Sequence, residues 1–168
     1  DEGIHGHTIR LDENKRNSPA IQAFADRLLG GPAERPDAAD MVFVGAWGRE
    51  AVMGLIANIR EAHPEEIIAI ISGDVRRWRA SAREKDLTVM NPREEGVLTP
   101  GLYIIGQLGG KGLEFDDVIV DCAQMAEPDE GTLKNILYVN CTRARRRLYL
   151  RYAGEPPALL RRFYPDCL

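Results

Sequence analysis

The sequence has few metal-binding or cross-linking side chains, and those it has are scattered. Its three cysteines have no paired spacing, so they indicate neither a disulfide framework nor a zinc knuckle. The cysteines are Cys122, Cys141 and Cys167. Two histidines, His5 and His7, lie near the start, and His63 is remote from both. Without a clustered ligand set, we expect no metal site.

Long hydrophobic runs and an excess of positive charge are also missing. The longest apolar run, Ile67 to Ile71, is far too short to cross a bilayer, so we expect no membrane partner. The first residues lack both an initiator Met and an apolar secretory core, which predicts a cytoplasmic protein cut from a longer chain. A net charge of -4 argues against a strongly basic, stand-alone nucleic-acid binder. The length of 168 residues suits one domain, which we assign to 1–168.

Apolar runs alternate with amphipathic segments along most of the chain. The expected strands are a short one near His7, then Met41–Val44, 66–74, Leu87–Met90, Leu102–Ile105, 116–122 and 148–154. The expected helices are Pro19–Leu29, 48–64, 75–85 and 132–147. Residues 31–40 are predicted to form a surface loop. This alternation predicts an α/β fold with three layers, in which a mainly parallel sheet carries helices on both faces. Ligands of such sheets gather at the carboxyl ends of the strands, and we expect the informative residues there.

The stretch from Gly106 to Val120, "GQLGGKGLEFDDVIV", invites comparison with a phosphate-binding loop, but its spacing is wrong. Such a loop needs a glycine five positions before Gly110 and a hydroxyl after the lysine. Here Ile105 takes the first position and Gly112 follows Lys111. The chain therefore lacks a Walker A loop of its own.

Three segments nevertheless resemble signature motifs of the second RecA-like domain of UvrD/Rep-like superfamily 1 helicases. "KGLEFDDVIV" is similar to the family's K-G-L-E-F block, and "NILYVNCTRARRRLYL" is similar to its L-Y-V-A-x-T-R-A motif, with Asn140 where alanine is usual. "LDENKRNSPAI" resembles the N-Y-R-S segment, with Lys15 replacing tyrosine. The motifs span residues 11–152 in the family's order. The cysteine directly before Thr142 and Arg143 resembles the sequence pattern of the helicase IV-like branch of this family.

The resemblance implies which residues face a nucleotide. It places the guanidinium groups of Arg143 and Arg16 near the γ-phosphate of ATP, where permanent positive charge lowers the barrier to phosphoryl transfer. Glu114 would accept a hydrogen bond from the ribose, and Gly112 would let the backbone approach closely. Lys111 and Thr142 are the further candidates for nucleotide binding. ATP and Mg²⁺ are expected in the full-length protein, at a cleft with a first RecA-like domain, and this domain alone should bind neither and be inactive.

Each candidate also has a structural interpretation. An arginine run at a helix end is typical of a solvated face, Glu114 could be a surface carboxylate, and Arg16 could be another loop cation. The three motifs together favour the functional interpretation. Within the expected helix 132–147, a buried stripe leaves Arg143 off its centre and free to face another domain. The stripe consists of Leu133, Ile136, Leu137, Cys141 and Ala144.

Two positions depart from the family. The threonine and histidine that precede the K-G-L-E-F block and engage the single strand correspond to Gly106 and Leu108 here. Three functions therefore stay open: a DNA-unwinding motor with single-stranded DNA as its partner, an ATP-driven remodeller of RNA polymerase or another protein machine, and a degenerate module that only docks a partner. Arg76, Arg77 and Arg79 around Trp78 suit nucleic acid, but we favour an exposed helical face with one buried aromatic anchor. Trp47 is likewise interpreted as packing.

Overall fold

A computed structural model of the chain describes residues 17–32, 41–92, 97–109, 112–125 and 129–168. The predicted strand near His7 and most of the predicted loop 31–40 lie outside the described residues. Within these ranges, six strands form one sheet in the order β1-β6-β5-β2-β4-β3, and every neighbouring pair is parallel. The strands are β1 Val42–Gly45, β2 Ile67–Ile71, β3 Val89–Met90, β4 Gly101–Ile105, β5 Phe115–Asp121 and β6 Ala144–Arg151.

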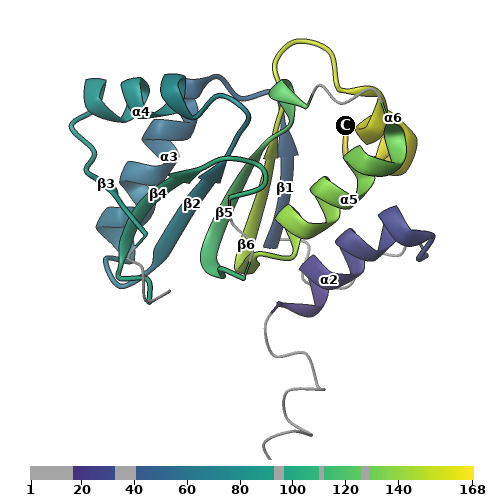
Figure 1. Cartoon of the computed structure of the whole chain (residues 1–168), viewed down its shortest axis with the longest axis horizontal. Helices are drawn as coiled ribbons and strands as arrows, with labels where there is room; N and C mark the ends of the chain where they lie inside the picture. Colours follow the sequence, from purple (N-terminus) through teal and green to yellow (C-terminus); the bar gives the residue numbers. More distant parts are fainter. Residues whose placement is uncertain (1–16, 33–40, 93–96, 110–111, 126–128) are drawn as a thin grey trace, which may run out of the picture.

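Helices cover both faces of this sheet, as the alternating pattern predicts. Figure 1 shows α3 (Arg49–Ala62) and α4 (Val75–Glu84) on one side, with α2 (Pro19–Asp26) and α5 (Glu130–Cys141) on the other. The short α6 (Ala158–Phe163) packs on the same side as α2 and α5. The three-layer α/β fold is therefore confirmed.

Alternation along the strands explains the two hydrophobic cores. In β2, Ala69 and Ile71 point to the layer of α2 and α5, whereas Ile68 and Ile70 point to α3 and α4. All four are fully buried. A strand that is apolar on both faces is typical of a parallel sheet with two helical layers. In α2, Ser18 caps the helix through its side-chain oxygen, and Pro19 is the first helical residue.

The prediction of a helix over 132–147 is wrong in its last third. The helix α5 ends at Cys141, and β6 begins at Ala144, so Arg143 lies in a two-residue turn. The run from Ala144 to Arg147 has residues that suit a helix, but it pairs with β5 instead. Tertiary pairing has overridden local propensity. Among the described residues, α6 and the 3-10 turn Pro165–Cys167 had no counterpart in the sequence-based prediction.

Across the described part of the chain, no helix combines the length and apolar character that a membrane span needs.

Candidate functional site

The residues that the motifs single out meet at the amino ends of β5 and β6. Phe115 and Ala144 are paired at the start of these strands, and the Phe115 amide donates to the Arg143 carbonyl at 2.9 Å. The residues just before each strand, Glu114 and Arg143, therefore lie on adjacent loops. The expectation that the informative residues lie at the carboxyl ends of the strands is wrong. They lie at the opposite edge, because both motifs enter strands instead of leaving them.

The half-buried Arg143 side chain is directed toward the loop that precedes β5. Its Nη1 donates to the carbonyl oxygen of Leu113 at 3.4 Å. Its backbone amide donates to the Asn140 carbonyl at 3.2 Å, which closes the end of α5. Arg143 thus links the T-R-A turn to the K-G-L-E-F block. Leu113 and Arg143 are 30 residues apart in sequence, so this hydrogen bond brings two separate motifs into contact.

Thr142 has a local role in the end of α5. Its hydroxyl donates to the Val139 carbonyl at 3.0 Å, and its backbone amide donates to the Tyr138 carbonyl at 3.0 Å. Both bonds satisfy carbonyl groups that the last helical turn would otherwise leave open. The nucleotide contact expected of Thr142 stays a prediction.

Asn17 precedes α2 and holds the start of this helix against the turn that carries Arg143. Its Nδ2 donates to the carbonyl oxygens of Thr142 at 2.7 Å and Ala144 at 2.6 Å, and the Ser18 amide donates to the Arg145 carbonyl at 3.1 Å. Arg16 and Lys111 lie outside the described residues. The chain at position 17 is nevertheless held beside the turn that carries Arg143.

Gly112 and Glu114 line a small pocket at this edge. It has a volume of about 270 Å³, and its walls are Ile67, Leu98, Gly112, Leu113, Glu114 and Arg145. Gly112 has a φ of 82°, in the left-handed region that favours glycine, and a side chain there would meet no atom within 4 Å. The backbone at Gly112 is therefore open to close approach from outside.

Arg143 itself lines a second, more apolar pocket. It has a volume of about 320 Å³ and is lined by Gln107, Leu108, Asn135, Ile136, Val139, Asn140 and Arg143. Leu108 is 78% exposed and Val139 is 40% exposed. At the position where the family has a histidine, this chain presents an aliphatic side chain to the surroundings.

A cluster of charged side chains that the motifs did not predict lies near the amino ends of β5 and β6. Arg147 Nη2 is 2.9 Å from Glu66 Oε1, and its Nη1 is 3.4 Å from Asp117 Oδ1. Burial, reinforced by the neighbouring carboxyl group of Glu66, raises the pKa of Asp117 to about 8. Burial acts in the same direction on Glu66, but Asp117 and the charges of Arg147 and Arg146 outweigh it and lower the pKa of Glu66.

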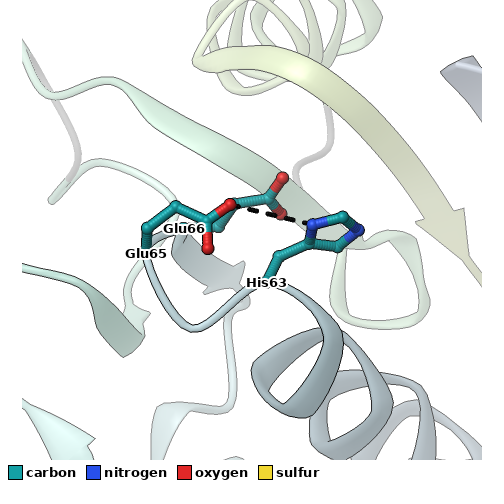
Figure 2. Close-up of side chains that lie close together, drawn as sticks. All are labelled: His63, Glu65 and Glu66. Carbon is teal, nitrogen blue, oxygen red and sulfur yellow. Dashed lines mark ion pairs between the residues drawn. The ribbon is translucent and has the colours of Figure 1, made fainter.

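Three side chains that could ligate a cation adjoin this cluster, and the expectation of no metal site stays a prediction. Ligand atoms of His63, Glu65 and Glu66 all lie within 4.8 Å of one another, and Figure 2 shows the three side chains facing each other. They stand within four consecutive residues, "HPEE", between α3 and β2. The signal for this group in the sequence is the short spacing of one histidine and two glutamates. A search for clusters of histidine and cysteine alone does not detect it.

The two tryptophans pack as interpreted from the sequence. Trp78 is buried, and its Nε1 donates to Asp121 Oδ2 at 2.8 Å, whereas Arg76, Arg77 and Arg79 are exposed on α4. Trp47 is half-buried and sits edge-on to the ring of Tyr149, with 6.2 Å between ring centroids. These contacts confirm the interpretation of one aromatic anchor beneath an exposed basic face.

Comparison with known proteins agrees with the motif resemblance. Residues 110–151 match the family model described as the UvrD-like helicase C-terminal domain. The fold is similar to the crystal structure of the C-terminal domain of a possible DNA helicase from Lactobacillus plantarum WCFS1, with a TM-score of 0.67 and 23% identity over 90% of this chain and 94% of that one. The match confirms the resemblance to a UvrD-like C-terminal domain, and the structural likeness confirms the fold.

A second solved structure is more distant. It is the complex of arterivirus nonstructural protein 10, a helicase, with DNA, and its TM-score is 0.44 at 12% identity. The match covers 92% of this chain and 36% of the viral one. No curated protein sequence matches this chain. The finer assignment to a helicase IV-like branch stays a prediction.

Proposed function

We propose that this domain, for which the family match supports a helicase-related role, is the C-terminal motor domain of an ATP-dependent DNA helicase or translocase. A first RecA-like domain would hold ATP and Mg²⁺ through its own phosphate loop. The amino edge of β5 and β6 would then close the cleft over the nucleotide. In this arrangement Arg143 and Arg16 supply positive charge near the γ-phosphate, and Glu114 accepts a hydrogen bond from the ribose.

The observation that carries the proposal is the meeting of three motif segments at one edge of the sheet. Arg143 Nη1 contacts the Leu113 carbonyl, which places the guanidinium beside the loop that contains Gly112 and Glu114. Asn17 holds the first segment to the same turn through two hydrogen bonds. A chance resemblance in sequence has no reason to bring separate motifs into contact.

The local chemistry of this edge suits a nucleotide. Bound ATP would supply the phosphoryl group, whose transfer develops negative charge on the terminal oxygens. The Arg143 guanidinium is planar and permanently charged, so it can stabilise that charge without a proton transfer. Gly112 leaves the backbone accessible, and the pocket it shares with Glu114 and Arg145 has space for part of a sugar. Closing and opening of the cleft between the two domains would move the protein along a nucleic-acid strand.

The decisive experiment measures strand-stimulated ATP hydrolysis by the full-length protein with Arg143→Ala. We expect turnover to fall by about a thousandfold, because an arginine finger contributes roughly that factor in comparable enzymes, while ATP affinity changes only by a small factor. Arg143→Lys should not restore the rate, since a lysine cannot present the planar fork. Arg161→Ala is the matched control, because Arg161 is exposed on α6 and away from the amino edge. Turnover near the wild-type rate in Arg143→Ala would refute the proposal.

One observation favours an alternative within the same motor. Leu108 and Val139 form an exposed apolar wall beside Arg143, and apolar surface of this kind suits a protein partner better than a phosphate backbone. The second candidate is therefore an ATP-driven remodeller of a protein machine. Unwinding of a tailed DNA duplex by the full-length protein separates the two, because the remodeller would hydrolyse ATP without unwinding. RNA polymerase as that machine stays a prediction from sequence.

A further inference from the structure

Two buried carboxyl groups, those of Glu66 and Asp117, meet at one guanidinium near the amino ends of β2 and β5. Arg147 Nη2 donates to Glu66 Oε1 at 2.9 Å, and Arg147 Nη1 lies 3.4 Å from Asp117 Oδ1. Both nitrogens belong to one planar group, so the carboxyls that they contact are neighbours. The side chains of Glu66 and Asp117 also hydrogen-bond to each other. We call these two side chains the carboxyl pair.

Three oxygens of the carboxyl pair are buried without a nitrogen or hydroxyl donor among the described residues. They are Glu66 Oε2, Asp117 Oδ1 and Asp117 Oδ2. Ionised oxygens in this position are costly, because nothing replaces the water that they have lost, and two adjacent carboxylates repel each other. One proton on the pair removes both costs. It gives one carboxyl an O–H group that can donate to the other, and it cancels one of the two charges.

Charged and titratable groups from three neighbouring elements face the carboxyl pair. They are Arg60 and His63 at the end of α3, Asp116 of β5, and Arg146, Arg147 and Tyr149 of β6. Asp116 adds negative charge beside Asp117. Arg146 Nη1 lies 3.3 Å from Glu66 Oε1, but its side chain is 59% exposed, so water and salt screen its charge. Arg147 is therefore the one largely buried cation that contacts both acids in the described part of the chain.

We propose that Glu66 and Asp117 share one proton at neutral pH, and that loss of this proton at alkaline pH loosens the amino ends of β2, β5 and β6. Burial, reinforced by the hydrogen bond with Glu66, raises the pKa of Asp117 to about 8. Burial acts in the same direction on Glu66, but its hydrogen bond with Asp117 and the charge of Arg147 outweigh burial and lower the pKa of Glu66. The proton therefore resides mainly on Asp117, and Glu66 stays ionised beside Arg147.

The direction of the pH effect follows from the raised pKa of Asp117. Its folded pKa lies above the unfolded value of about 4, so its contribution to stability is complete below that value and is lost as pH rises to about 8. Above this pH, two buried carboxylates face each other, and separation of the strand ends relieves their repulsion.

The backbone next to the carboxyl pair forms part of the pocket at the amino edge. The Ile67 amide donates to Asp116 Oδ2 at 2.8 Å, and the Gly101 amide donates to the Glu66 carbonyl at 3.2 Å. Ile67 also lines the pocket that contains Gly112 and Glu114. The proton on the carboxyl pair thus controls the rigidity of this wall, whether or not a nucleotide binds there.

The first test is urea unfolding of the full chain at several pH values between 5.5 and 7.5. From the carboxyl pair alone, the folding equilibrium constant of the wild type should fall by about tenfold per pH unit. Asp117→Asn and Glu66→Gln should each lack this contribution, because either amide removes one charge and donates a permanent hydrogen bond to the remaining carboxylate. Asp116→Asn is the matched control and should keep the wild-type slope, since Asp116 instead pairs with Arg145 and Arg146.

Equal slopes in the wild type and both amide variants would show that the pair holds no shared proton and would overturn the proposal. If Asp117→Asn does not fold, Glu66→Gln carries the same comparison. Carbon-13 NMR of the aspartate carboxyl carbons needs no variant: one aspartate of the wild type should titrate near pH 8. Midpoints below about 5 for every aspartate would contradict the proposal.

The second test is amide hydrogen exchange at pH 8.5, compared between the wild type and Glu66→Gln. The amides of Ile67 and Gly101 should exchange at least several-fold faster in the wild type, because they lie beside the deprotonated pair. The Ser72 amide is the control, since it donates to the Ile105 carbonyl at the opposite edge of the sheet and should exchange equally in both chains. Equal acceleration of all three amides would indicate global destabilisation and would overturn the local effect on the amino edge.

Discussion

Asp121 and Arg151 face each other directly across β5 and β6, and both are buried. Arg151 Nη1 lies 2.9 Å from Asp121 Oδ1, while Trp78 Nε1 and the Ser72 hydroxyl donate to Asp121 Oδ2 at 2.8 and 2.6 Å. Arg151 Nε donates to the Trp47 carbonyl at 3.0 Å. Four residues earlier on the same two strands, Asp117 faces Arg147 in the same way. The two pairs lie on the face that packs against α3 and α4.

Asp121→Asn should lower the free energy of unfolding by about 3 kcal/mol or more, because it leaves the Arg151 guanidinium buried without a counter-charge. Urea denaturation followed by circular dichroism measures this change. Asp86→Asn is the control, since Asp86 is exposed at a φ of 54°, a conformation that asparagine adopts readily. The double variant Asp121→Asn/Arg151→Met should recover part of the loss. A double variant no more stable than Asp121→Asn would contradict this account of the pair.

Trp78→Phe should destabilise the domain by about 1–3 kcal/mol, because it leaves one oxygen of Asp121 short of a donor and leaves a cavity. Thermal unfolding measures the change. The half-buried Trp47→Phe should cost less. If Trp78 were instead a base-stacking platform, Trp78→Phe would weaken single-stranded DNA binding by the full-length protein and leave stability nearly unchanged.

Asn17→Ala should cost about 1–2 kcal/mol in unfolding free energy, because it removes two hydrogen bonds to the carbonyls of Thr142 and Ala144. Asn17→Asp should cost more, since a carboxylate would face two carbonyl oxygens and cannot donate. In the full-length protein both variants should also lower ATP turnover, by loosening the turn that carries Arg143. A destabilised Asn17→Ala variant with unchanged turnover would separate this anchor from the proposed site.

Tyr164→Phe should lower the unfolding free energy by about 1 kcal/mol or somewhat more. The buried Tyr164 hydroxyl donates to the Phe24 carbonyl at 2.8 Å, and its ring stacks on Phe24 at 4.0 Å between centroids. The variant keeps the stacking and loses only the donor. Tyr138→Phe is the comparison, because its hydroxyl makes a longer, less buried contact with Gln22 at 3.3 Å and should matter less. Equal losses would indicate that burial of the hydroxyl is not the cause.

Asp129 should make the stability of α5 depend on pH in the acid range. Its carboxylate accepts from the Thr132 hydroxyl and from the amides of Gly131 and Thr132, and these bonds lower the pKa of Asp129. A lowered folded pKa means that the contribution is present above the unfolded value of about 4 and is lost as pH falls through the folded value. Asp129→Ala should therefore lower the midpoint of thermal unfolding at neutral pH and have little effect near pH 2. An equal decrease at both pH values would exclude the carboxylate charge as the cause.

The layers and most elements could be predicted from the sequence because apolar periodicity reports burial directly. The runs Met41–Val44 and Leu102–Ile105 are apolar enough to indicate strands covered on both faces, and they lie within one residue of β1 and β4. Trp78 could be assigned to the core because it is the one aromatic residue among the exposed arginines of α4. Such features depend on neighbours in sequence, which pattern analysis sees.

Features that depend on distant partners could not be predicted in the same way. The boundary between α5 and β6 was missed because pairing of Ala144 with Phe115, and not local propensity, ends the helix. The edge of the sheet that carries the site was misplaced for the same reason. Asp117 and Arg147 are thirty residues apart, and only the register of β5 and β6 shows that they share one buried position. The motifs identified Arg143, but its contact with Leu113 required the fold.

The strand order has a consequence for synthesis on the ribosome. Among the described strands, β1 pairs only with β6, through contacts such as Val42 with Leu148, so it must wait for its partner until β6 has been translated. Until then β1 is without its neighbour in the sheet and is a candidate for chaperone capture. Nascent chains that stop before β6 should therefore be sensitive to protease along β1, whereas a short extension beyond Tyr152 should protect it in a single step.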